Sequence, residues 1–129
     1  MKKIVALLAV LVAVLFLLFK VGVDSVIQTI PNDSMVVFVK TGCSHCHQAM
    51  AFVDETVRRD YPSLKIEVLN IDKEENREKL LAVIHRNRIS PRKAGTPLIL
   101  IDGHVLIGWD ERREHELTTL IRAFLSKRS

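Results

Sequence analysis

The stretch Val36-Val37-Phe38-Val39-Lys40-Thr41-Gly42-Cys43-Ser44-His45-Cys46-His47 decides the fold, and it holds the only two cysteines of the 129-residue chain. Its apolar, β-branched first half predicts a buried strand that stops at Gly42, and a helix-compatible segment begins directly afterwards. Two residues between the cysteines allow both thiols to lie on the first helical turn, close enough for a disulfide. A thiol at a helix N-terminus is favoured as a thiolate. The stretch therefore predicts a thiol–disulfide redox site, with Cys43 as nucleophile and Cys46 as resolving cysteine.

Two other interpretations of the same residues involve metals. Cys43-Ser44-His45-Cys46-His47 matches the Cys-x-x-Cys-His motif that attaches c-type haem, which would make the domain an electron-transfer protein. A copper-delivery module that uses Cys43, Cys46 and His47 is a third alternative. A zinc site is disfavoured because four ligands within five residues cannot readily surround one ion tetrahedrally. We expect no metal and no cofactor other than the redox-active disulfide.

The N-terminus carries an unbroken apolar run from Ile4 to Phe19, with two lysines before it and Lys20 after it. Sixteen helical residues span about 24 Å. Residues 21–23 extend the run towards the ~30 Å of a bilayer core, with Lys20 reaching to the interface. Residues 1–23 are therefore a signal peptide or a transmembrane anchor, and we favour the anchor because no small-residue cleavage site follows. Residues 24–34, which include Pro31, are expected to form a linker.

The charges around the apolar run predict its orientation. The N-terminal amine and two lysines precede the run, whereas acidic residues follow it soon after Lys20. The positive-inside rule then keeps the N-terminus in the cytoplasm and places the domain of residues 35–129 outside, where disulfides persist. We expect a single-pass protein of the bacterial inner membrane with a periplasmic domain. A net charge of +4 with 5% aromatic residues, and no basic stretch interleaved with aromatics, does not indicate nucleic-acid binding.

Periodicity along the chain predicts four strands and three helices in this domain. Strands are expected at 35–40, 65–71, 97–101 and 104–108, and helices at 44–59, at 74–87 and after Asp110, a plausible N-cap. In the second helix Leu80, Leu81 and Ile84 are expected to face inward. Asp102-Gly103 is a hairpin turn signal. The order β-α-β-α-β-β-α requires two parallel strands first and an antiparallel hairpin last, and a mixed four-stranded sheet covered by helices satisfies both.

The domain resembles the thioredoxin superfamily, and in length it is most similar to a glutaredoxin. The strand with Lys40 three positions before Cys43 is similar to the glutaredoxin strand, and Gly95-Thr96-Pro97 is similar to the loop whose cis-proline faces the two cysteines. Residues 101–110 are similar to the closing hairpin and helix start. His45, directly before Cys46, resembles the periplasmic disulfide oxidants. The resemblance implies an α/β fold of the minimal glutaredoxin form, thiol–disulfide oxidoreductase activity and a cis Thr96–Pro97 bond.

Roles for individual residues follow partly from the resemblance and partly from the position and chemistry of the residues themselves. Thr96 and Pro97 would offer backbone groups to an extended substrate. Lys40 would stabilise a thiolate or bind a substrate carboxylate, unless it is only a solvated lysine at a strand end. His45 would support the Cys43 thiolate. Trp109 is expected to be partly exposed at the rim of the site, as a substrate contact, with a place in the core as the alternative.

The expected partners are protein thiols and disulfides, together with a possible membrane redox partner. Glutathione use stays open, because Trp109 stands where glutaredoxins usually have the second of two glycines. Val37 stands where thioredoxins carry a buried acid, so proton transfer through such a carboxylate is not supported.

Overall fold

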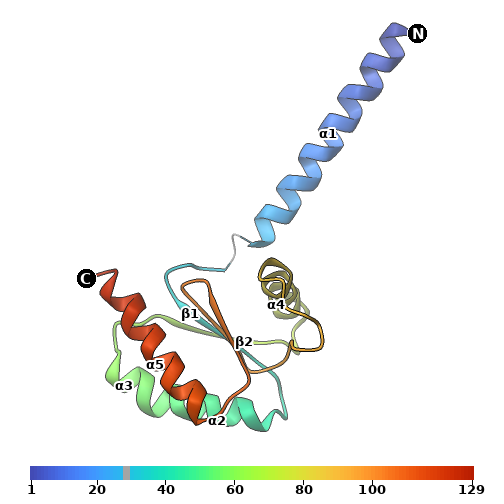
Figure 1. Cartoon of the computed structure of the whole chain (residues 1–129). Helices are drawn as coiled ribbons and strands as arrows, with labels where there is room; N and C mark the ends of the chain where they lie inside the picture. The colour runs from blue at the N-terminus through green and yellow to red at the C-terminus, as the bar shows by residue number, and fades with distance from the viewer. Residues whose placement is uncertain (28–29) are drawn as a thin grey trace. The chain divides into compact units, whose positions relative to one another are not determined.

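The computed structural model describes residues 1–27 and 30–129, with side chains described at positions 1–19 and 30–129. The chain forms two compact units, residues 1–30 and 31–129. The first unit is the helix α1 (Lys2–Ile27), shown in Figure 1. The expected linker is therefore helical as far as Ile27, since no proline or glycine interrupts positions 24–27. Positions 28 and 29 of that linker lie outside the described residues.

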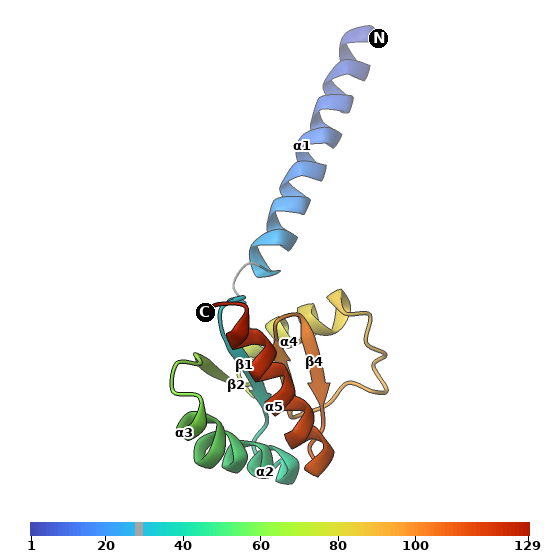
Figure 2. The same ribbon diagram turned by 60° about the vertical axis from the view of Figure 1, so that its left-hand side comes forward.

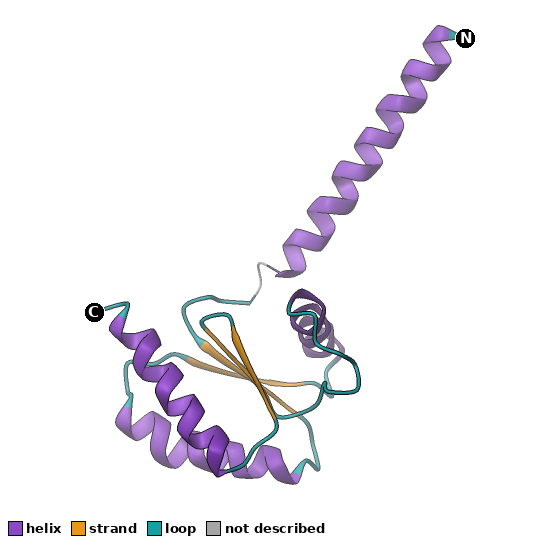
Figure 3. Ribbon diagram, viewed as in Figure 1, coloured by secondary structure: helices purple, strands orange, loops and turns teal. Residues whose placement is uncertain are grey.

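The second unit has the element order that the sequence predicts, with one difference in its first helix (Figure 3). A π-helical segment interrupts the helix expected at 44–59, so this region consists of three consecutive elements. The elements are β1 (Met35–Val39), α2 (Ser44–Phe52), the π-helix η1 (Val53–Val57), α3 (Arg58–Asp60), β2 (Ile66–Asn70), α4 (Glu74–Arg86), β3 (Leu98–Ile101), β4 (His104–Ile107) and α5 (Glu111–Ser126).

The four strands form one mixed sheet in the order β2-β1-β3-β4. β1 pairs in parallel with β2, and Val37 lies opposite Val68. β1 also pairs antiparallel with β3, which in turn pairs antiparallel with β4. The expected mixed sheet is thus confirmed, and β1 is a central strand that delivers the Cys43 loop from the middle of the sheet.

Helices cover both faces of the sheet, which explains the continuous apolar run of β1. α4 lies on one face, and α2, η1 and α5 lie on the other (Figure 2). Met35 to Phe38 are fully buried, because alternate side chains of a strand point to opposite faces and both faces are covered here. The larger core lies on the α2 and α5 face, where Val37 packs with Val53, Leu117 and Ile121.

The inward face of α4 differs from the prediction at one position. Leu80 and Val83 are buried and Ile84 is partly buried, but Leu81 is 57% exposed. The expectation that Leu81 faces inward is wrong. Residues three and four apart share a helix face, and Leu81 is displaced by about 100° from Leu80, outside the buried stripe.

The closing hairpin and α5 form as expected. Asp102 and Gly103 both have positive φ, 48° and 76°, as a tight two-residue hairpin turn requires. Asp110 is the N-cap of α5, and its carboxylate accepts a hydrogen bond of 2.9 Å from the Arg113 backbone N–H. These local signals place the turn after β4, and with it Trp109, beside α2.

Candidate redox site

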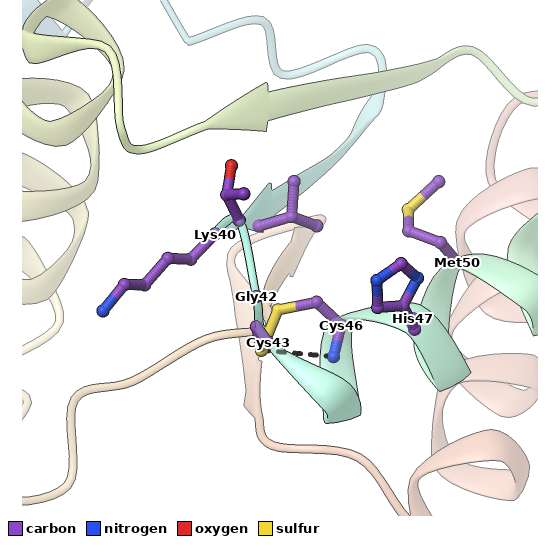
Figure 4. A pocket seen from close by; sticks show the side chains of 8 residues that line it. Lys40, Gly42, Cys43, Cys46, His47 and Met50 are labelled. Carbon is purple, nitrogen blue, oxygen red and sulfur yellow. Dashed lines mark hydrogen bonds between the residues drawn. A yellow bond between two sulfur atoms is a disulfide. The ribbon is translucent and has the colours of Figure 1, made fainter.

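Cys43 lies at the N-cap of α2 and forms a disulfide with Cys46, one turn into the helix. The two Cα atoms are 5.2 Å apart. Cys43 is partly exposed, whereas Cys46 is only 4% exposed. The Cys43 sulfur accepts a hydrogen bond of 3.2 Å from the Cys46 backbone N–H, drawn in Figure 4. The exposed sulfur is therefore the one that an incoming thiolate can reach, and a backbone donor is already aimed at it.

The loop before β3 contacts Cys43 from the other side. The Thr96–Pro97 peptide bond is cis, as expected. The Thr96 hydroxyl donates to the Cys43 sulfur at 3.6 Å, and the Thr96 carbonyl oxygen lies 3.7 Å from the same sulfur. A hydroxyl donor aimed at the sulfur favours negative charge on it, so the Thr96 contact acts in the same direction as the Cys46 N–H.

A polar network holds the turn that leads into Cys43. The Asp72 carboxylate, in the loop after β2, accepts from the Thr41 backbone N–H at 3.2 Å. Asn70 donates from its amide to the Thr41 hydroxyl at 3.3 Å and accepts from the Asp72 N–H at 2.8 Å. The hydrogen bond from Thr41 lowers the pKa of Asp72, and the positive charge of Lys40 adds to this. Sequence analysis did not identify this network. Its only signal in the sequence is the pair of polar residues Asn70 and Asp72 at the end of β2.

The two charged or titratable residues proposed to act on Cys43 are both exposed. Lys40 follows β1, and Figure 4 shows its side chain extending away from the disulfide. His45 lies on the first turn of α2, between the cysteines, with no ion pair in the part of the chain that the structure describes. Both side chains are therefore open to solvent near the turn that carries Cys43.

Trp109 is a core residue, and its expected partial exposure is wrong. Its side chain is 6% exposed and belongs to the main hydrophobic core. The indole packs on Phe52 of α2, with ring centroids 5.5 Å apart and planes tilted by 48°. The residue thus joins the start of α5 to the helix that carries the cysteines.

A pocket of about 270 Å³ opens beside the disulfide. Its lining includes Cys46, His47 and Met50 of α2, together with Val39 at the end of β1 and Lys40 (Figure 4). His47 and Met50 are three positions apart and so share a face of α2. His47 was considered in the sequence only as a metal or haem ligand, and the structure places it at the pocket next to Cys46.

Comparison with solved structures identifies the fold. A buckwheat glutaredoxin–glutathione complex aligns with a TM-score of 0.55 at 17% identity, over 83% of this chain and 90% of that one. The holo form of glutaredoxin C1 from Populus tremula x tremuloides gives 0.53 at 16%, over 84% and 99%. Wheat glutaredoxin gives 0.53 at 16%, over 81% and 91%. No protein-family model matches the sequence, and a search of curated proteins finds no match.

The second unit has the glutaredoxin-like form of the thioredoxin fold. The expected fold class is confirmed, down to the mixed sheet and the cis-proline loop beside the cysteines. Among the side chains described at 1–19 and 30–129, no set of three or more His, Cys, Asp or Glu residues is arranged to hold a metal ion.

The glutaredoxin-like domain has an uncharged interior below the disulfide. Val37 is fully buried where a thioredoxin would carry an acid. Ser34 is the only buried polar residue among those described, and it lies before the first residue of β1, at the opposite end of that strand from Cys43. Proton transfer at this site therefore has no partner in the core.

Proposed function

We propose that this chain is a membrane-anchored thiol–disulfide oxidoreductase that exchanges disulfides with protein substrates through Cys43 and Cys46. The observation that carries the proposal is the position of the Cys43 sulfur. It lies at a helix N-terminus, accepts from the Cys46 N–H at 3.2 Å and contacts Thr96 of the cis Thr96–Pro97 bond. Thiol–disulfide exchange needs an accessible sulfur whose thiolate is stabilised, and all three contacts serve that requirement.

The exchange proceeds through a mixed disulfide. A substrate thiolate attacks the Cys43 sulfur, the Cys43–Cys46 bond breaks, and Cys46 leaves as a thiolate. A second substrate thiolate then attacks the substrate sulfur of the mixed disulfide, and Cys43 leaves. The substrate loses two electrons to form its disulfide, and the cysteine pair gains them as a dithiol. Run backwards, the same steps reduce a substrate disulfide.

Thr96 and Pro97 are the proposed substrate-binding residues. Thr96 is partly buried and contacts Cys43, so an extended segment that pairs with the Thr96 backbone would bring its own sulfur to Cys43. Lys40 is exposed directly before the Thr41-Gly42 turn, where its ammonium can bind a substrate carboxylate. Glutathione is the alternative thiol for this site, since one of the similar structures is a glutaredoxin–glutathione complex.

The proposed location follows from α1. Lys2–Phe19 is long and apolar enough to cross a membrane, a property that signal sequences share. We place the protein in the bacterial inner membrane with its redox domain on the periplasmic side, because Lys2 and Lys3 precede the span. An oxidising compartment matches a domain whose two cysteines form a disulfide.

Trapping of the mixed disulfide tests the function. The purified Cys46→Ser variant is mixed with 5-thio-2-nitrobenzoate-labelled or disulfide-bonded protein substrates, and adducts are identified on non-reducing gels and by mass spectrometry. We expect adducts joined through Cys43 with Cys46→Ser and none with Cys43→Ser. Absence of adducts from both variants, or a Soret band from covalent haem in the wild-type protein, would contradict the proposal.

A further inference from the structure

We infer that His47 is the general base that removes the proton from Cys46 when the mixed disulfide is resolved, and the acid that returns it in the opposite direction. The inference rests on the proposed function, because it concerns the step of the same exchange in which Cys46 attacks Cys43, which is the second step when a substrate disulfide is reduced. It starts from a need of the chemistry. Cys46 must be a thiolate to attack, and a thiol buried in apolar surroundings resists ionisation.

The core offers no acceptor for that proton. Cys46 is 4% exposed. The position on β1 from which a buried carboxylate could accept the proton is occupied by Val37, which is fully buried. Within the described part of the chain, Ser34 is the sole buried polar side chain, and it lies near the far end of β1. The proton therefore has to leave Cys46 on the side of the pocket.

The pocket presents one suitable group. Besides the cysteines, its titratable lining residues are Lys40 and His47. A lysine ammonium has three donors and no acceptor, and the Lys40 side chain extends away from the disulfide (Figure 4). A neutral imidazole has one free acceptor nitrogen and exchanges protons in the neutral pH range.

The surroundings of His47 leave its ring available. It follows Cys46 directly on α2, its backbone N–H donates to the Cys43 carbonyl at 3.2 Å, and its side chain is exposed at the pocket. The charged groups on neighbouring elements are Lys40 after β1 and, behind Thr41, Asp72 after β2. No ion pair or side-chain hydrogen bond involves His47 among the side chains described at 1–19 and 30–129.

The step balances as follows. In the mixed disulfide, the Cys46 S–H proton passes to the free ring nitrogen of His47, directly or through a pocket water. The Cys46 thiolate attacks the Cys43 sulfur, the Cys43–Cys46 bond forms, and the substrate sulfur leaves as a thiolate. The cysteine pair is oxidised by two electrons over the whole cycle and the substrate disulfide is reduced, while His47 passes its proton to solvent.

The test measures the two steps separately in the full-length protein. Adduct formation at Cys43 is followed with Cys46→Ser in the wild-type and the His47→Gln backgrounds. Resolution is followed in rapid-quench experiments with both cysteines present, for wild type, His47→Gln and His47→Ala, between pH 5 and 9. His104→Gln is the matched control, because His104 is exposed at the start of β4 and does not line the pocket.

We expect the same rate of adduct formation with or without His47→Gln, and resolution at pH 7 slowed by about tenfold or more in both His47 variants. A general base typically raises a rate by about 10²–10⁴-fold. The loss of rate in the variants should be smaller than this, because the Cys46 thiol can still give its proton to water. The pH profile of resolution in the wild type should differ from that of both variants, because the variants lack the imidazole that takes the proton. Added imidazole should restore resolution in His47→Ala.

The outcomes separate the two proposals. If no adduct forms in any background, the oxidoreductase function itself fails. If adducts form normally but His47→Gln and His47→Ala resolve at the wild-type rate with the wild-type pH profile, the assignment of His47 is overturned. A uniform slowing at every pH without rescue by imidazole would also overturn it, since that pattern marks a packing effect.

Discussion

Replacing Trp109 distinguishes a core residue from a substrate contact. The side chain is 94% buried, and a tryptophan removes roughly 200–250 Å² from water. At about 25 cal/mol per Å² this corresponds to ~5–6 kcal/mol, an upper limit that a compact unfolded chain reduces by about 10–40%. Trp109→Ala should therefore cost about 3–5 kcal/mol of unfolding free energy. Trp109→Phe, which keeps an aromatic ring against Phe52, should cost about 1–2 kcal/mol.

The measurement is urea unfolding of the full-length protein in detergent, followed by circular dichroism. Fluorescence cannot follow the variants, because Trp109 is the only tryptophan. Total domain stabilities of about 5–15 kcal/mol mean that Trp109→Ala can leave the domain barely folded, so Trp109→Phe is the interpretable change. At a temperature where Trp109→Phe is fully folded, its rate of adduct formation at Cys43 should equal the wild-type rate.

Phe52→Leu tests the ring contact itself. The double variant with Trp109→Leu, which removes the second ring, should show a coupling free energy of about 0.5–1.5 kcal/mol, since the two rings touch across α2 and the start of α5. The reasoning is refuted if Trp109→Phe costs less than about 0.5 kcal/mol while substrate exchange slows by tenfold or more. That combination would mean that Trp109 contacts substrate after all.

Three further predictions concern the anchor and the surroundings of Cys43. Residues 4–23 should hold the protein in the membrane through carbonate washing of fractionated cells, and recovery of a shortened soluble product would show a cleaved signal peptide instead. His45→Leu should raise the Cys43 thiol pKa and make the reduction potential more negative, as read from thiolate absorbance and glutathione equilibration; identical values in both proteins would leave His45 without this role. Asp72→Ala should speed hydrogen exchange at the Thr41 amide. Because the pKa of Asp72 is lowered in the folded protein, the hydrogen bond from the Thr41 N–H to its carboxylate should be present at neutral pH and be lost as pH falls through that lowered pKa. An unchanged exchange rate in Asp72→Ala would refute the role of this hydrogen bond.

Much of the fold could be predicted because its signals are local. The apolar run of β1, the turn at Asp102-Gly103 and the cap at Asp110 each act within a few residues, and the structure has them where they were expected. The parallel pairing of β1 with β2 follows from the helix between them. The pairing of the two cysteines was predicted from their spacing, and the cis bond before Pro97 was predicted from the resemblance alone.

The features that sequence analysis missed depend on contacts between distant residues. Trp109 stands between Gly108 and Asp110, which suggests a surface turn, and only the arrival of Phe52 from α2 buries it. The Asp72 hydrogen bond to Thr41 joins positions 31 apart, across two strand ends that meet only when β1 and β2 pair. Leu81 was mispredicted in the opposite sense, because an apolar residue next to the buried face of a helix can still be exposed.

The redox direction of the site follows from which form of Cys43 its surroundings stabilise. The Cys46 N–H and the Thr96 hydroxyl both donate to the Cys43 sulfur, and the N-terminus of α2 adds its dipole. We expect His45 to supply a further donor from the same turn. No acidic residue lies within nine positions of Cys43 in the sequence, and the Asp72 carboxylate that reaches this turn accepts from the Thr41 N–H. A stabilised thiolate favours the reduced pair, which makes the disulfide the stronger oxidant, so we expect a potential above the ~−270 mV of thioredoxin. If the measured potential is instead as negative as that of thioredoxin, these donors mainly position the Cys43 sulfur and do not stabilise its thiolate. A reductase supplied with electrons from the membrane then becomes the better account.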